Sequence, residues 1–279
     1  MKPAEYCRDL ASPPGSSSHY SLLFLSAPAR DAVNAVRAFF REINSIAEEC
    51  GEASLGHTKF HWWREELAGI YSGKAQHPVG RAMIDAIGAF SLPESEMREI
   101  IDGTEQKFGT FCYPDFDTMQ NICGQPSAAL ARIEARIYGF DNPATLEYAD
   151  RLGRALQLIH IIRNVGKEAR NGRCALPLDE LERFDVPVQD ILSYRQSVAF
   201  ESLMRFQGDR AENFCQRALA SLPAEDQHRQ LPGRILLVLY RALLSEIVRE
   251  RFSVLDRRTS LTPLRKFWLA WRTRMKNTA

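Results

Sequence analysis

The sequence lacks a long hydrophobic run, an excess of charge of one sign and a leader-like N-terminus. Its longest apolar stretches, such as residues 235–240, are far shorter than the roughly 18 residues that cross a bilayer. Lys and Arg (36) balance Asp and Glu (35) to a net charge of +1, so we expect no nucleic-acid partner. No basic segment followed by an apolar one opens the chain, so we expect no signal peptide.

Cysteine is present, but not in a pattern that binds metal or forms disulfides. The six cysteines are scattered along 279 residues, and none belongs to a CxxC pair. Without a secretory signal, we expect free thiols in a reducing compartment. The sequence therefore predicts a cytoplasmic protein, with peripheral attachment to the inner membrane kept as an open alternative.

Helical periodicity dominates the chain, and the alternating runs typical of strands are almost absent. The composition, 45% hydrophobic and 25% charged, is that of a globular protein, and no stretch has the composition of an interdomain linker. We therefore predict a single all-α domain over residues 1–279, with about eight to ten helices. The strongest helical patterns cover residues 31–49, 59–71, 77–91, 94–109, 126–138, 142–169, 188–220 and 233–256.

The segment 142–169 is apolar around most of its helical circumference, which is typical of a buried helix. A single narrow polar stripe runs along it, formed by Gly153, Gln157, His160, Asn164 and Glu168. Buried polar groups need partners. The stripe therefore predicts either a water-accessible cavity lined by these residues or a self-contained polar network, and the pattern alone does not choose between them.

A repeated Asn-x-x-x-Glu motif is the second polar feature. Segment 31–49 has the pattern of an amphipathic helix, with a polar stripe of Asn34, Arg37, Arg41, Asn44 and Glu48. The pair Asn44 and Glu48 recurs as Asn164 and Glu168, and the i,i+4 spacing places both oxygen-bearing side chains on one helix face. Two such helices facing each other would offer oxygen ligands to Mg²⁺. A single motif of this kind is more typical of a solvated helix face.

The C-terminal run, residues 261–271, and the residues directly after it mix large apolar and basic side chains. The apolar ones are Leu264, Phe267, Trp268 and Trp271, and the basic ones are Arg265, Lys266, Arg272 and Arg274. Such a segment can contact an anionic bilayer, which makes peripheral membrane contact one hypothesis. A helix with basic flanks that packs on its own domain is the simpler interpretation.

Residues 152–177 read LGRALQLIHIIRNVGKEARNGRCALP, which is similar to the second signature of the squalene/phytoene synthase family, approximately LGxALQLxNxxRDxxEDxxxGRxxLP. Further matches in the same order cover most of the chain, at residues 15–21, 30–48, 63–67, 77–78 and 240–266. Within the family, the sequence resembles most the bacterial presqualene-diphosphate and squalene synthases of the hopanoid pathway.

The resemblance implies a fold and a reaction. The expected fold is an isoprenoid-synthase-type helical bundle around a central cavity, and the expected activity is Mg²⁺-dependent head-to-head joining of two prenyl diphosphates such as farnesyl diphosphate. By position, Arg30 and Arg163 match arginines that contact diphosphate, Arg41 leads the first motif, and Gln157 matches a cavity glutamine. Neither the prenyl chain length nor the oligomeric state follows from the resemblance.

The sequence departs from the family where metal is expected to bind. The family has aspartates in both motifs, whereas this chain has Asn44 and Glu48 in the first and Asn164 and Glu168 in the second, with Lys167 beside the latter. An amide keeps an oxygen ligand but removes a negative charge, so the affinity for Mg²⁺ should fall. These four residues remain the candidate metal ligands.

Two further departures leave the catalytic residues unassigned and two functions open. Ile122 stands where the family has a tyrosine, and His160 where it has a cavity asparagine. One hypothesis is an active prenyltransferase. The other is a catalytically degenerate member that binds a lipid or a partner protein, because assembly factors of respiratory complex I resemble this family and also lack its aspartates.

Overall fold

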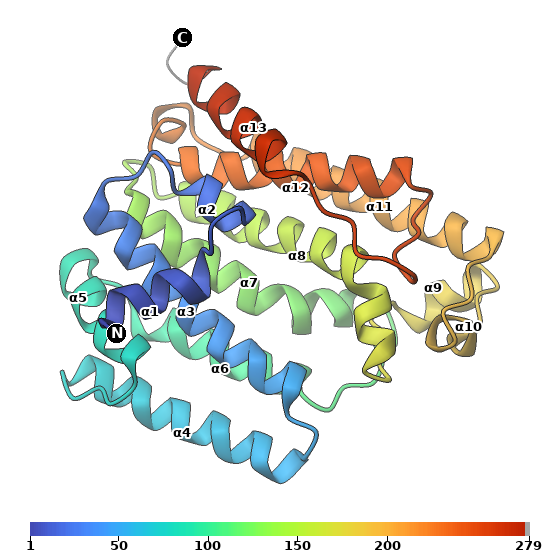
Figure 1. The fold of residues 1–279 in the computed structure, drawn as a ribbon, viewed down its shortest axis with the longest axis horizontal. Coiled ribbons are helices and arrows are strands. Elements are labelled where there is room, and N and C mark those ends of the chain that lie inside the picture. The colour runs from blue at the N-terminus through green and yellow to red at the C-terminus, as the bar shows by residue number, and fades with distance from the viewer. Residues whose placement is uncertain (277–279) are drawn as a thin grey trace.

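The structure is a computed structural model that describes residues 1–276. These residues form thirteen α-helices and one short 3₁₀ helix, without a β-strand, which confirms the all-α prediction (Figure 1). The helices are α1 Pro3–Ala11, α2 Ser17–Ser21, α3 Ala27–Glu49, α4 Ala53–Tyr71, α5 Pro78–Phe90, α6 Glu94–Lys107, α7 Phe116–Tyr138, α8 Thr145–Arg170, α9 Leu178–Arg183, α10 Val188–Leu192, α11 Val198–Ala220, η1 Ala224–Asp226, α12 Leu231–Arg249 and α13 Pro263–Lys276.

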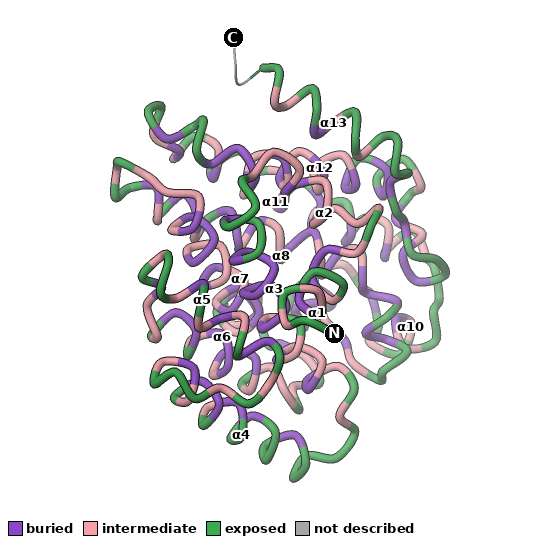
Figure 2. The backbone as a smooth tube through the Cα atoms, turned by 60° about the vertical axis from the view of Figure 1, so that its left-hand side comes forward, coloured by how far each residue is buried: buried purple, intermediate pink, exposed green. Residues whose placement is uncertain are grey.

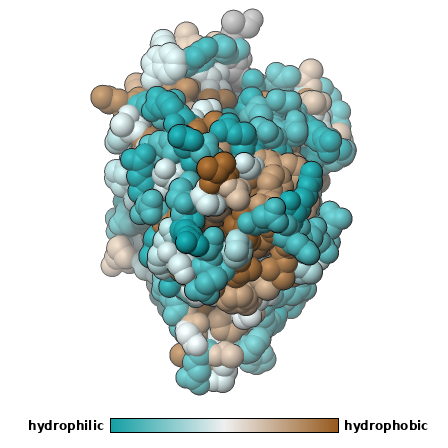
Figure 3. Space-filling view, turned by 90° about the vertical axis from the view of Figure 1, so that its right-hand side faces the viewer, coloured by the Kyte–Doolittle hydropathy of each residue, from teal (hydrophilic) through white to brown (hydrophobic). Residues whose placement is uncertain are grey.

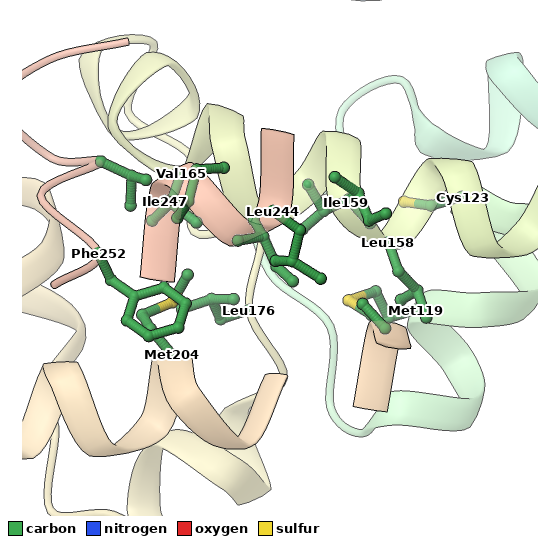
Figure 4. Packing of buried hydrophobic residues seen from close by; sticks show 14 of the residues in the cluster. Met119, Cys123, Leu158, Ile159, Val165, Leu176, Met204, Leu244, Ile247 and Phe252 are labelled. Atoms are coloured by element: carbon green, nitrogen blue, oxygen red, sulfur yellow. The ribbon is translucent and has the colours of Figure 1, made fainter. Parts of the chain in front are cut away.

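Helix α8 lies in the middle of the bundle, as its nearly all-round apolar pattern predicts. It packs against α7, α11 and α12, and the buried parts of the chain gather around α3, α7 and α8 (Figure 2). Ile159 and Ile162, at 0% and 2% exposed, confirm that the helix is buried. Figure 4 shows the cluster that holds it, in which Leu158 and Ile159 share a core with Leu244 of α12.

Two glycines let neighbouring backbone approach α8 closely. A Cβ atom added at Gly153 would lie 2.3 Å from the carbonyl oxygen of Ser127 on α7, and one added at Gly166 would lie 2.4 Å from that of Val254. Only glycine fits at such distances. Gly153 of the predicted polar stripe therefore serves helix packing, and Gly166 lets the segment after α12 lie against α8.

The prediction of one helix over residues 188–220 is wrong, because the chain turns in its middle. Helix α10 ends at Leu192, Tyr194 adopts a left-handed conformation with φ of 58°, and α11 begins at Val198. The Ser197 hydroxyl caps α11 by accepting the amide of Phe200 at 3.0 Å. A serine at this position is a start signal that the hydrophobic periodicity conceals.

The prediction of a helix over residues 233–256 is also too long. Helix α12 ends at Arg249, and Arg251 and Phe252 both adopt left-handed conformations, with φ of 52° and 54°. The reversal buries Phe252 completely in the main core. It leaves residues 253–262 as a non-helical segment that returns along α8 and carries Arg258.

Helix α7 begins ten residues before the predicted start at residue 126, and Pro126 lies inside it. Its ring packs where α6 has Gly103, whose added Cβ would lie 2.7 Å from the proline Cγ. The helix count exceeds the predicted eight to ten because short helices such as α1, α2 and α9 were not predicted. Within residues 1–276, no helix combines the length and the hydropathy that a bilayer crossing requires.

Candidate functional site

An open cavity lies along the polar stripe of α8. It measures about 400 Å³ including the part open to solvent, and Gln157, His160, Asn164 and Glu168 all line it. The stripe thus lines an opening, as the first interpretation predicts, and its polar side chains also pair with one another and with their neighbours, as the second predicts. The other walls come from the end of α6, the loop before α7 and the loop after α8, through Lys107, Thr110, Phe111, Tyr113, Cys123, Ile161, Arg173, Cys174 and Ala175.

The lining is both polar and apolar, which suits a ligand with a charged head and a hydrocarbon tail. Phe111, Ile161 and Ala175 supply apolar surface beside the polar stripe. Figure 3 shows the end of the molecule where α9 and α10 lie, with a hydrophobic area bordered by hydrophilic side chains. Gln157 accepts a hydrogen bond from the Ser127 hydroxyl at 3.0 Å, so its amide is held at the cavity wall.

His160 forms a local network on α8. Its Nε2 lies 2.7 Å from Nδ2 of Asn164, and its Nδ1 lies 3.5 Å from the Arg163 guanidinium. Burial, reinforced by the nearby charges of Arg163, Lys107, Lys167 and Arg258, holds the pKa of His160 well below its usual value. The imidazole is therefore neutral in the folded chain at physiological pH.

We expect this histidine to make folding stability fall in mild acid. Below about pH 6.5 the unfolded chain takes up a proton at His160 that the folded chain does not, so acid favours unfolding by up to about 1.4 kcal/mol per pH unit. Urea unfolding from pH 7.5 to 5.5 should show a shallower dependence for His160→Asn than for the wild type. The exposed His61 gives the control, since His61→Asn should keep the wild-type slope; equal slopes for all three proteins would contradict the assignment.

The two Asn-x-x-x-Glu motifs meet where α3 and α8 end. Lys167 forms an ion pair with Glu48 at 2.5 Å, so the second motif reaches across to the first. Glu168 forms an ion pair with Arg173 at 2.8 Å, and Arg173 also donates to the carbonyl oxygen of Ala47 on α3 at 3.3 Å. Both carboxylates are thus already neutralised by basic side chains of the same chain.

This donor set does not fit a preformed Mg²⁺ site. The Asn44 amide donates to the Phe40 carbonyl of its own helix at 2.8 Å, and the Asn164 amide is engaged with His160. Each carboxylate would have to leave a basic partner before it could bind metal. Within residues 1–276, no three His, Cys, Asp or Glu side chains form a group that could hold a metal ion.

A cluster of cations lies beside the first motif. Partial desolvation lowers the pKa values of Arg41, Arg163 and Lys266. The positive charge of Arg258 lowers all three pKa values further. The charge of Arg41 also lowers the pKa of Arg163, and the charge of Arg163 lowers that of Lys266. Tyr240 partly offsets this for the two arginines, and Glu48 does so for Arg41. Across the described chain, no salt bridge neutralises any of these four basic groups, here called the cation cluster.

The structure separates the predicted diphosphate ligands. Arg41 and Arg163 belong to the cation cluster, whereas Arg30 lies in the first turns of α3, exposed, about 16 Å along the helix from Arg41. Sequence reasoning missed Arg258, because the segment that carries it is not helical and lies beside α8 only after the reversal at Phe252.

Tyr113 is a further cavity residue that sequence reasoning missed. Ile122, at the position of the family tyrosine, packs against the core. The neighbouring Cys123 thiol donates to the Tyr113 hydroxyl at 3.0 Å, and the tyrosine enters from the loop before α7. Backbone pairing holds the loop, since the amide of Leu178 donates to the Tyr113 carbonyl at 2.9 Å. Burial strongly raises the pKa of Tyr113, so its hydroxyl keeps its proton.

Comparison with known proteins gives this site a family. Residues 12–265 match the family model described as squalene/phytoene synthase. The chain belongs to the squalene/phytoene synthase family. Members of the squalene/phytoene synthase family are prenyltransferases that condense prenyl diphosphates head to head, and they generally depend on divalent metal.

Several relatives of this squalene/phytoene synthase family member are similar over most of their length. A phytoene synthase of Mycobacterium bovis is 30% identical, covering 90% of this chain and 84% of the relative. A presqualene diphosphate synthase of Zymomonas mobilis is 25% identical, covering 93% and 90%. The crystal structure of a dehydrosqualene synthase in complex with ligand shares the fold, with a TM-score of 0.88, 19% identity and coverage of 99% of this chain and 96% of that one. The predicted isoprenoid-synthase-type bundle is thereby confirmed.

Proposed function

We propose that this chain, acting as one unit over its length, binds a prenyl diphosphate of the farnesyl class and joins two such molecules head to head. The observation that carries the proposal is the cation cluster, whose members form no salt bridge among the described residues and lie beside a cavity with apolar walls. Guanidinium groups bind phosphate oxygens in a bidentate manner, and clustered cations attract a polyanion. The relatives named as phytoene and presqualene diphosphate synthases support the choice of substrate.

Each part of the site has a role in this proposal. Arg41, Arg163 and Arg258 bind the diphosphate and stabilise the negative charge that grows on it as the carbon–oxygen bond breaks. The apolar wall holds the prenyl chain and keeps water from the electron-poor carbon. The protonated Tyr113 hydroxyl supplies a hydrogen-bond donor to the cavity, whereas the Ile122 side chain has none.

Mg²⁺ remains the cofactor suggested by the family, with Asn44, Glu48, Asn164 and Glu168 as the candidate ligands. In this chain the ion pairs of Glu48 and Glu168 compete with metal, so we propose that diphosphate binding depends on the cation cluster first. The same ion pairs favour a second candidate function, in which the chain binds a prenyl diphosphate or related lipid without turnover.

Incubation with radiolabelled farnesyl diphosphate tests the proposal. Purified protein with Mg²⁺ should slowly convert the label into a product that extracts into organic solvent, because an under-charged metal site ionises the substrate inefficiently. Arg163→Met should abolish the product, whereas Arg151→Met, on the exposed start of the same helix, should not. Label that stays bound but never becomes extractable would favour the second function, and absence of both binding and product would overturn both.

A further inference from the structure

Helix α13 is attached to the bundle by one face only. It packs on α12 and α2, and Ala270 is its one buried residue, with Leu269 partly buried beside it. Figure 1 places it on the outside of α12, and Figure 2 shows it as a largely exposed stretch at the edge of the molecule. Most of its circumference therefore faces solvent.

The outer face of α13 is hydrophobic. Five of the thirteen exposed large hydrophobic side chains in the described chain belong to this helix, each 48–82% exposed: Leu264, Phe267, Trp268, Trp271 and Met275. Steps of three, one, three and four residues along the helix place them on one face, which does not include the buried Ala270. Exposed hydrophobic side chains that are scattered singly are normal on a protein surface. A continuous apolar stripe of this kind is instead typical of an interaction surface.

Charge complementarity indicates which partner covers this outer face. Helix α13 contains no acidic residue, and its basic side chains flank the stripe. The Arg272 guanidinium lies 5.1 Å from the centre of the Trp268 ring, and Arg274 and Lys276 have no salt bridge within residues 1–276, whereas Arg265 is paired with Glu246. Tryptophan beside arginine is the composition that favours the interface between hydrocarbon and anionic headgroups.

We propose that the outer face of α13 docks on an anionic phospholipid bilayer, with Trp268 and Trp271 inserted at the level of the headgroups. The proposal goes beyond the function of the cavity and depends only on the surface of α13. It has a consequence for the cavity, because Lys266 lies on the inner side of the same helix. Its ammonium group donates to the Gly15 carbonyl at 2.8 Å and belongs to the cation cluster, so helix α13 would lie between the docked bilayer and that cluster.

Vesicle flotation of the full chain tests the proposal. Wild type should float with vesicles of equal parts phosphatidylglycerol and phosphatidylcholine, and much less with phosphatidylcholine alone. Trp268→Ser/Trp271→Ser should lower the partitioning by on the order of tenfold. Leu55→Ser/Val198→Ser, which removes two exposed apolar side chains from α4 and α11, should float like wild type. Circular dichroism melts verify that each variant is folded.

Quenching by brominated lipids gives a second readout that unfolding cannot imitate. Wild-type tryptophan fluorescence should be quenched by anionic brominated vesicles, whereas the double tryptophan variant, which keeps Trp62 and Trp63, should not be quenched. Failure of wild type to float, or equal flotation of the tryptophan variant, would overturn the proposal. A dimer that is lost in this variant, without flotation of wild type, would instead show that a second copy of the chain covers the face.

Discussion

Farnesyl diphosphate should bind this chain in the presence of a chelator, and should lose on the order of 100-fold in affinity when Arg163 is replaced by methionine. The four basic groups of the cation cluster form no salt bridge within residues 1–276, whereas the four candidate metal ligands are neutral or already paired. A diphosphate therefore finds its charge complement in the protein itself. Calorimetric titration with Mg²⁺ and with EDTA measures both parts of the prediction.

Matched variants separate this account from an ordinary metal-dependent site. Arg151→Met, on the same helix but paired only with Glu147 at the surface, should bind like wild type. The double change Asn44→Asp/Asn164→Asp should make binding more dependent on Mg²⁺, because it restores two anionic oxygen ligands. Tight wild-type binding that disappears when the metal is chelated would refute the cation-led account.

Replacing Glu134 by alanine should destabilise the fold by about 3–5 kcal/mol, because it leaves a buried guanidinium without its partner. Arg37 of α3 and Glu134 of α7 form two hydrogen bonds of 2.6 and 2.8 Å, and their side chains are only 6% and 8% exposed. The Tyr138 hydroxyl donates to the same carboxylate at 2.7 Å. Urea unfolding of wild type and variant measures the loss.

Two controls make this prediction specific. Glu212→Ala breaks a more exposed ion pair with Arg241 and should cost at most about 1 kcal/mol. The double variant Arg37→Met/Glu134→Leu should recover much of the stability lost in Glu134→Ala, because it removes both charges from the interior. Equal losses in Glu134→Ala and Glu212→Ala would show that the buried pair has no special role.

The features that follow from local periodicity could be predicted from the sequence. The buried α8 and its cavity stripe are examples, because apolar spacing reports which sides of a helix face the core. Periodicity also locates the polar stripe of α3, but it does not show which residues of that stripe are buried. Arg37 lies on that stripe and is buried, since its partner Glu134 is 97 residues away and no local pattern reveals it.

The residues that sequence reasoning missed depend on contacts between distant segments. The Tyr113 hydroxyl meets the Cys123 thiol because the loop that carries Tyr113 pairs with the segment after α8. Arg258 comes near Arg163 because two residues in left-handed conformations reverse the chain after α12. The ion pair of Glu48 with Lys167 joins residues 119 apart. Helical spacing identified both motifs, but only the folded chain shows that Lys167, within the second motif, neutralises the carboxylate of Glu48 in the first.

The Glu48–Lys167 ion pair also couples the effects of substitutions in the two motifs. An acidic residue at position 167 alone would replace the cationic partner of Glu48 by a carboxylate, and an aspartate at position 44 alone would add charge without completing a metal site. Effects of neighbouring charges are not additive, so the cost of a substitution at position 167 depends on the residue at position 48. A design that introduces acidic motifs should therefore change α3 and α8 together rather than one helix at a time.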